Sequence, residues 1–358
     1  MARKSTPAVT VSLRYCAARF PKPPKMPRGI GLDRMRLILQ TSDKWLNGSK
    51  VRYWFFDSPK KWVGGKDQQE VVRKAFAMWK ALGVGLDFVE VHARSEADVR
   101  IAFLEDDGAW SYIGTDVKTK RKDPRTMNFG WSLTEDPADG LDTALHEIGH
   151  TLGLPHEHQN PFAGIVWNEE AVYAALAKAP NRWSRSTTFH NIIEKLVADE
   201  VQGSHWDADS VMHYPFEPGL IDKPAQFRAG ITPAGGLSAR DRQWILKFYP
   251  QLGPPTTFPT LQPLQSVPLA LAPAQQANFL FKPTQTREYE FRTFGASDTL
   301  IAIYEGPGGS GPALAEDDDS GEGRNAYFKV TLTKGRTYVV RVRLYYAEEE
   351  GETAIMAW

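Results

Sequence analysis

The sequence contains a single cysteine, Cys16, among its 358 residues. One cysteine cannot form an intramolecular disulfide, and it cannot build a structural zinc site that depends on several thiolates. The chain also lacks an excess of charge of either sign, because Lys+Arg and Asp+Glu both total 43. We therefore expect no binding to nucleic acid and none to an acidic membrane surface.

Long hydrophobic runs are missing as well. No stretch of about 18 apolar residues is present, so we expect no membrane span. The beginning of the chain is basic but lacks the sustained apolar segment of a signal peptide. Hydrophobic residues make up 42% and charged residues 24% of the chain, as in soluble globular proteins. The pattern predicts a soluble protein, which we assume to be a monomer, with no visible signal peptide.

The composition changes along the chain and predicts four regions. Residues 1–44 include the run PKPPKMP, which favours an extended arm and a possible pro-segment over a packed helix. Residues 45–251 mix strand and helix patterns and predict an α+β domain. Residues 252–275 are rich in proline and almost uncharged, as expected of a stiff linker. Residues 276–358 carry short strand patterns between Gly- and Asp-rich turns, which predict a small all-β sandwich.

Regular elements are predicted within these regions from hydrophobic periodicity. In the first domain we expect strands at 51–56, 86–91 and 97–104, shorter strands at 111–115 and 126–131, and helices at 67–82, 141–152, 168–179 and 238–249. In the second we expect strands at 287–294, 299–305, 326–332 and 336–346.

The segment HEIGHTLGLPH carries the chemistry of the first domain. On a helix, His146 and His150 lie four residues apart and project from the same face. Glu147 is rotated by about 100° and can reach a water molecule on a metal without binding the metal itself. Glycine at position 153 permits the sharp turn that brings His156 back toward the other two histidines. Three protein ligands with one exchangeable position are typical of catalytic zinc.

HEIGHTLGLPHEH, together with DSVMHYPF at 209–216, resembles the metzincin zinc metalloproteases and most closely their astacin-like branch. The likeness extends over about 50–250 and includes WSYIG and NFGW. It implies a metzincin catalytic domain in which a cleft separates a half with a twisted sheet and helices from an irregular half.

The resemblance also implies roles for individual residues. Met212 would form the methionine turn beneath the three imidazoles, and Tyr214 would lie near the zinc and hydrogen-bond the oxyanion during turnover. Glu157, which follows the third histidine, would form an internal salt bridge. His158 and His213 are not expected to be ligands, because zinc already has three and needs a vacancy.

The substrate cleft is less well specified. We expect one of the two short strands, around 110–115 or 126–131, to form the sheet edge that pairs with an extended substrate. Three aromatic residues near these strands are candidates for the cleft wall: Trp110, Tyr112 and Trp131.

Cys16 lies in the predicted N-terminal arm. The chain lacks the Phe-x-Gly-Asp type of motif by which astacin-like enzymes are held inactive. Our hypothesis is that the Cys16 thiolate binds the zinc until the arm is removed, which would make the protein a zymogen. The alternative is an idle buried thiol.

The C-terminal region resembles the pre-peptidase C-terminal modules of bacterial proteases through GRTYVVRV and its spacing of strands. The acidic run from Glu316 to Asp319 is a candidate Ca²⁺ site, or alternatively a solvated turn.

These patterns predict a zinc-dependent endopeptidase, a hydrolase in which Glu147 activates a zinc-bound water to attack a peptide bond in a protein substrate. One alternative is a non-catalytic zinc-containing binding protein, and another is a zinc hydrolase of small peptides. The resemblance suggests an extracellular location, with the cytoplasm as the alternative.

Overall fold

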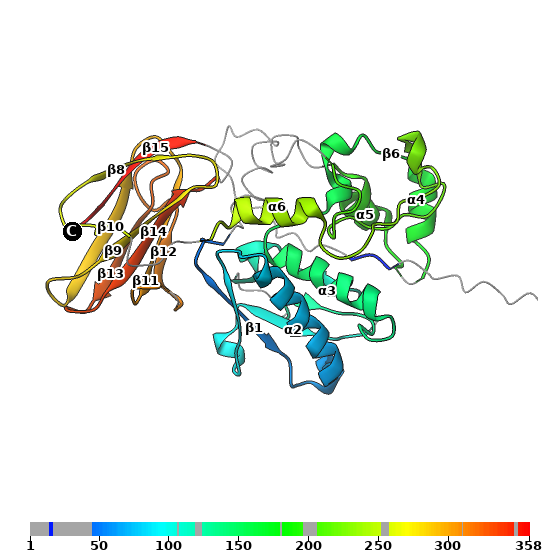
Figure 1. Ribbon diagram of the computed structural model, residues 1–358, viewed down its shortest axis with the longest axis horizontal. Helices are drawn as coiled ribbons and strands as arrows, with labels where there is room; N and C mark the ends of the chain where they lie inside the picture. Colours follow the sequence, from blue (N-terminus) through cyan, green and yellow to red (C-terminus); the bar gives the residue numbers. More distant parts are fainter. Residues whose placement is uncertain are drawn as a thin grey trace, which may run out of the picture.

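The computed structural model describes residues 14–16, 45–105, 107–118, 124–179, 181–195, 206–251, 258–309, 311–346 and 350–358. Two bodies follow each other along the chain (Figure 1). The first combines helices with a small sheet, and the second contains only strands. The predicted fold class, an α+β domain followed by an all-β domain, is confirmed.

The first domain has two halves. We call the half that contains a five-stranded sheet, in the order β2-β1-β3-β5-β4, the upper half, and the half with mostly irregular structure the lower half. The strands of this sheet are parallel except β4, which runs antiparallel to β5 and lies at the edge. Of the two candidate edge strands, the one that begins at Trp110 therefore holds this position. It is shorter than predicted, because the chain enters a 3-10 helix at Gly114. The strands are β1 (Lys50–Phe55), β2 (Asp87–Glu90), β3 (Val99–Ala102), β4 (Trp110–Ser111) and β5 (Met127–Asn128).

Two long helices, α2 (Lys66–Ala81) and α3 (Pro137–Thr151), pack beside each other on this sheet (Figure 1). Helix α3 starts earlier than predicted, because the Asp136 side chain accepts hydrogen bonds from two backbone N–H groups of the first turn and proline follows it. Such an N-cap satisfies donors that have no partner inside the helix. Trp79 of α2 is fully buried and its indole donates to the Leu145 carbonyl of α3, 3.1 Å away.

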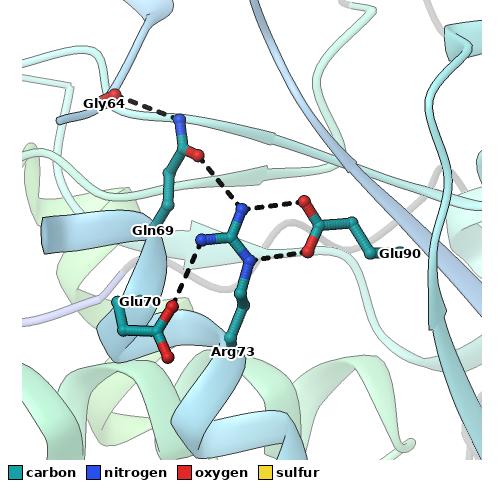
Figure 2. A network of polar contacts seen from close by, with 5 residues as sticks. All are labelled: Gly64, Gln69, Glu70, Arg73 and Glu90. Carbon is teal, nitrogen blue, oxygen red and sulfur yellow. Dashed lines mark hydrogen bonds and ion pairs between the residues drawn. The ribbon is translucent and has the colours of Figure 1, made fainter. Parts of the chain in front are cut away.

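A polar network joins α2 to the other edge of the sheet (Figure 2). The Arg73 guanidinium donates to both carboxylate oxygens of Glu90 in β2, at 2.6 and 2.8 Å. Gln69 and Glu70 hold the same guanidinium from the helix side. This ion pair lowers the pKa of Glu90. A two-pronged contact of this kind fixes an arginine more firmly than a single hydrogen bond does.

The lower half of the first domain has little regular structure. Its apolar core contains two residues of the N-terminal arm, Tyr15 and Cys16, beside Ile192 and Phe216. The chain then returns to the upper half through its last helix, whose Ile245 belongs to the upper core. The elements are the 3-10 helices η4 (Glu157–Gln159), η5 (Pro161–Ala163) and η8 (Ala225–Phe227), the π-helix η6 (Phe189–Ile193), the strands β6 (Val166–Trp167) and β7 (Ile221–Lys223), and the helices α4 (Glu169–Leu176), α5 (Arg185–Thr188) and α6 (Ala239–Phe248).

The second domain is a sandwich of two four-stranded antiparallel sheets, β13-β10-β15-β8 and β12-β11-β14-β9. Aromatic side chains such as Phe281, Tyr289 and Phe291 fill the space between them. The strands are β8 (Val267–Leu271), β9 (Gln276–Phe281), β10 (Arg287–Phe294), β11 (Thr299–Glu305), β12 (Ala313–Asp317), β13 (Tyr327–Leu332), β14 (Tyr338–Leu344) and β15 (Gly351–Ala357).

The predicted linker 252–275 needs a correction, because β8 lies within it and pairs with β15. The prolines of this segment, Pro268 among them, favoured a linker over a strand. However, β8 is the edge of its sheet, where a residue without an N–H group is tolerated. Residues 252–257 lie outside the described part of the chain, as does most of the arm predicted at 1–44.

The two domains contact each other through the segment that precedes β1. The Asn47 backbone N–H donates to the Gln276 side chain at 2.9 Å, and Gln276 donates back to the Asn47 carbonyl. Leu46 packs against Ala302 and Tyr304 of β11. Within the described ranges, no helix is long and apolar enough to cross a membrane.

Candidate active site

Helix α3 carries the first two histidines of the motif on one face. Their side chains are buried, and each Nδ1 lies close to a backbone carbonyl: His146 to Val211 at 2.7 Å and His150 to Leu154 at 2.8 Å. If Nδ1 carries the hydrogen in each case, Nε2 keeps its lone pair. Such second contacts are typical of histidines that bind metals, because they set the tautomer and the orientation of the ring.

The third histidine arrives by the turn that the sequence predicts. Gly153 has a φ of +89°, a conformation that glycine adopts without steric penalty. Beyond it, His156 lies buried with its Nε2 3.1 Å from Nε2 of His150. Its Nδ1 lies 3.3 Å from the Gln159 side-chain oxygen.

The four side chains Cys16, His146, His150 and His156 present ligand atoms that all lie within 4.8 Å of one another. Buried Nε2 of His146 has no hydrogen-bond partner in the part of the chain that the structure describes, although buried polar atoms are nearly always satisfied. Burial lowers the pKa of all three histidines, for His146 to about 4. Neutral imidazoles converging on one point, one of them orphaned, fit a metal ion with nitrogen ligands, and zinc suits this donor set.

Glu147 is the next residue along α3 and is fully buried. Among the described residues its carboxylate oxygens make no close hydrogen bond, although the nearby Cys16 thiol partly offsets the effect of burial on its pKa. Burial raises the pKa of Glu147 to about 8. A carboxyl group with a raised pKa beside a metal-binding cluster is well suited to exchange protons near neutral pH.

Met212 lies directly against α3, and its predicted place beneath the three imidazoles stays a prediction. It is buried, and its carbonyl accepts from the N–H of Glu157 at 3.0 Å. A Cβ atom at Gly149 would come within 2.3 Å of its sulfur. Glycine at 149 is therefore what permits the methionine turn to approach the helix this closely.

Tyr214 lies beside the cluster and contacts both the third histidine and the arm. Its hydroxyl is 2.5 Å from Nε2 of His156 and donates to the Cys16 carbonyl at 2.7 Å. The Cys16 sulfur is 3.5 Å from Nε2 of His150 and equally far from that of His156. Burial raises the pKa of this thiol, and a cation among the histidines would act in the opposite direction.

Glu157 does not form the expected salt bridge. Among the described residues its carboxylate accepts from the Asp207 backbone N–H at 2.9 Å and from the Asn160 side chain at 3.1 Å. These neutral donors do not fully offset burial, which raises the pKa of Glu157 to about 7. The carboxylate thus ties the segment after the third histidine to the loop before the methionine turn.

Sequence analysis missed Asp241, which holds this loop from α6. Its carboxylate accepts from the Ser210 hydroxyl at 2.7 Å and from the N–H groups of Val211 and Ser238, each at 2.9 Å. The signal was present, because Ser238 and Asp241 have the spacing of a capping box. The structure adds that the same carboxylate fixes Val211, whose carbonyl orients His146.

The aromatic residues predicted for the cleft divide into two groups. Trp110 and Tyr112 lie two residues apart on the same side of the chain and pack in the upper core. The prediction that these two line the cleft is therefore wrong. Trp131 instead packs against the lower core, and the guanidinium of Arg14 lies over its ring, 5.5 Å from the centroid.

The acidic run of the second domain is also divided. Glu316 pairs with Lys118 of the first domain at 3.2 Å. The carboxylates of Asp317, Asp318 and Asp319 lie within 4.8 Å of one another. Glu316 is therefore removed from the candidate cation site, and calcium at the other three stays a prediction.

Neither His158 nor His213 joins the cluster. His158 lies 2.8 Å from the Asn191 carbonyl and His213 2.7 Å from the Tyr214 carbonyl. Both are buried and have lowered pKa values because of that burial. They belong to the packing of the lower half.

Known proteins resemble this chain over the first domain. The match with karilysin of Tannerella forsythia is 26% identical over 145 residues, which are 36% of this chain and 29% of karilysin, so it spans less than a third of that protein. A structure of myroilysin is 30% identical, covers 59% of this chain and 98% of its own, and has a TM-score of 0.53. A second myroilysin structure is 27% identical, covers 67% of this chain and 92% of its own, and has a TM-score of 0.47.

A family model that describes astacin, a family of peptidases, matches residues 38–219. The match includes the three histidines, Glu147, Met212 and Tyr214, and it spans half of the chain. The protein therefore belongs to the astacin family of peptidases.

Proposed function

We propose that the protein is a zinc-dependent endopeptidase that cleaves peptide bonds in proteins. The observation that carries this proposal is the convergence of three neutral, buried histidines on one point beside the buried carboxyl group of Glu147. Membership of a peptidase family supports it.

His146, His150 and His156 would hold the zinc ion. When bound, zinc supplies Lewis acidity and makes a water molecule in its open position more acidic. Glu147 would take a proton from the attacking water and deliver it to the departing amine nitrogen. Tyr214 places a hydroxyl donor at the same point, where it would stabilise the negative charge that develops on the carbonyl oxygen.

The edge strand β4 would bind the substrate backbone. Among the described strands it lies at the edge of the sheet beside β5, and an extended peptide can add to a sheet edge through main-chain hydrogen bonds. This mode of binding depends little on side chains, which suits an enzyme acting on protein substrates.

Cys16 would keep the enzyme latent. Its sulfur already lies among the imidazoles, and its carbonyl accepts the Tyr214 hydroxyl. As a thiolate it would occupy the position that the water needs, and removal of the arm would free that position. One residue of the arm would thus occupy the position of the attacking water and also engage the Tyr214 hydroxyl.

The test compares casein cleavage and zinc content for the parent and Glu147→Gln, each before and after proteolytic removal of the arm. Glu170→Gln is the matched control, because Glu170 is exposed on α4 and pairs only with Arg185 among its described contacts. We expect zinc in every form and cleavage by the arm-free parent and control only. Full-length Cys16→Ser should be active without cleavage of the arm.

Other outcomes would favour the alternatives. Zinc in all forms without cleavage of casein or of peptides would indicate a non-catalytic zinc protein. Cleavage of short peptides alone would indicate a hydrolase of small peptides. A protein without zinc would contradict the proposal at its basis.

We also propose that the protein acts outside the cell and that calcium binds at Asp317–Asp319. The family membership supports the first, and the clustered carboxylates support the second. Detecting the protein in culture medium tests the location. A calcium-dependent rise in the unfolding temperature of the parent, absent in Asp318→Asn, tests the cation site.

A further inference from the structure

Tyr15 is buried in the lower half although it belongs to the N-terminal arm. Only 6% of its surface is exposed. Its ring meets that of Tyr214 edge-on at 5.2 Å, lies nearly parallel to that of Phe216 at 5.8 Å, and has Trp183 on a further side at 6.4 Å. We call this set of three rings the Tyr15 pocket. Aromatic rings prefer such offset and edge-on neighbours, so the pocket selects a flat ring.

The main chain of the arm is held on both sides of this ring. The Tyr15 N–H donates to the Asn181 side-chain oxygen at 3.1 Å, and the Cys16 carbonyl accepts the Tyr214 hydroxyl. Neither contact depends on the identity of the side chain. Any peptide that crossed the site in this way would find the same donor and acceptor.

Arg14, the next residue outward, lies on Trp131. Its guanidinium is 5.5 Å from the ring centroid, a distance typical of cation–π contacts. Burial raises the pKa of Asp139 in the first turn of α3, and the nearby positive charge of Arg14 offsets part of this effect. A face made of Trp131 and Asp139 suits a basic side chain.

The charge near the Tyr15 pocket is negative. The Glu217 carboxylate lies near enough to Tyr15 to act on it electrostatically. A neutral ring is compatible with this charge, whereas an aspartate or glutamate side chain would be both desolvated and repelled.

We propose that Arg14 and Tyr15 occupy the subsites of the substrate, and that the active enzyme therefore selects an aromatic residue next to the scissile bond and a basic residue one position further out. This inference rests on the proposed peptidase function. Because Tyr15 adjoins Cys16, whose sulfur lies among the histidines, the Tyr15 pocket serves a residue that flanks the bond to be cut.

The experiment measures kcat/KM of the arm-free enzyme on peptides that vary at both residues flanking the scissile bond and at their outer neighbours. We expect tyrosine or phenylalanine at one flank to exceed alanine by at least about tenfold, and aspartate by more. Lysine or arginine next to the aromatic residue should add about two- to fivefold, as for an exposed cation–π contact. Equal rates for aromatic, alanine and aspartate peptides would overturn the proposal.

Variants link these preferences to the two subsites. Trp183→Ala should reduce the aromatic preference and leave the basic one, and Trp131→Ala should do the reverse. Trp244→Ala on α6 is the control, because this half-buried tryptophan lies outside both subsites. Preferences that survive both Trp183→Ala and Trp131→Ala would contradict the assignment.

A binding measurement separates this inference from the proposed function. The arm-free Glu147→Gln variant should bind the peptide Arg-Tyr-Ser more tightly than Arg-Asp-Ser, detected by tryptophan fluorescence. Selective binding by this variant would support the subsites even if the parent cleaved nothing. If the parent cleaved peptides without selectivity in either assay, the proposed subsites would be wrong and the proposed peptidase function would stand.

Discussion

The two halves of the first domain position their site residues by different kinds of interaction. The upper half places His146 and His150 on a long helix that packs on a sheet through an apolar core. The lower half supplies His156 and Tyr214 from short turns, and buried polar groups such as Glu157 and Asp241 hold the adjoining loops. Regular backbone hydrogen bonds make the upper half rigid, whereas hydrogen bonds to side-chain acceptors do so in the lower half.

The comparison also shows that the halves depend on different segments of the chain. The upper core is complete within residues 45–251, because Trp45 to Tyr249 supply all its members. The lower core includes Tyr15 and Cys16 from the arm. We therefore expect the lower half to respond to changes in the arm and the upper half to be indifferent to them.

The largest effect is expected in the upper core. Trp79→Ala removes a fully buried ring and its hydrogen bond to Leu145, and it should lower the free energy of unfolding by about 3–5 kcal/mol. Urea unfolding followed by circular dichroism measures this. Trp79→Phe should lose less, because it keeps most of the apolar contact. A loss below about 1 kcal/mol for Trp79→Ala would contradict the view that the upper half depends on apolar packing.

A smaller loss is expected from a polar change in the lower half. Asp241→Ala leaves the Ser210 hydroxyl and two backbone N–H groups without their acceptor, which should cost about 2–3 kcal/mol. Zinc retention during dialysis against a chelator should fall as well, because Val211 orients His146. Asp241→Asn, which keeps one acceptor oxygen, should show an intermediate loss. Unchanged zinc retention in Asp241→Ala would show that the loop containing Val211 does not contribute to metal binding.

A substitution in the N-terminal arm tests whether only the lower half depends on the arm. Tyr15→Ala should raise amide hydrogen exchange at 163–193 in the lower half by about tenfold, and should leave 72–86 in the upper half unchanged, because only the lower core contains the ring. Exchange detected by mass spectrometry measures both regions in one sample. Equal acceleration in both regions would mean that the domain opens as one unit.

The smallest effect concerns the surface network of Figure 2. Arg73→Ala should cost at most about 1 kcal/mol at pH 7, because both partners are about one-third exposed. The pKa of Glu90 is lowered in the folded protein, so the pair stabilises above the unfolded-state pKa of about 4.3. That contribution is lost as the pH falls through the folded-state pKa. The difference between parent and Arg73→Ala should therefore shrink below about pH 4 in thermal unfolding curves. A constant difference from pH 7 to pH 3 would show that the charge of Glu90 is not involved.

The upper half could be predicted from sequence because its elements are periodic. Helix α2 and strands β1 and β3 lie within a few residues of their predicted bounds, since their apolar spacing determines which face is buried. The lower half offered little such periodicity beyond the helix predicted at 168–179, which the structure contains as α4. The histidine spacing predicted its one essential turn at Gly153, but the positions of Asp241 and Asn181 depend on contacts between distant segments.

The errors have physical causes of the same kind. Trp110 begins the short edge strand and Tyr112 follows it, and sequence alone did not show that this side of the chain faces the core. Pro268 looked like part of a linker because its tolerance depends on which strand lies at the edge. Tyr15 gave no signal at all, because its importance comes from rings that lie about 170 to 200 residues further along the chain.

The strand order of the sandwich has a consequence for how the chain acquires its structure. Strand β15 follows all the other described strands along the chain, yet it lies between β10 and β8 inside its sheet. Until Gly351–Ala357 have emerged, β8 has no partner in this sheet and β10 has only β13. The second domain must therefore fold after its translation is complete, whereas the first domain, which precedes it, can fold while the second is still being made.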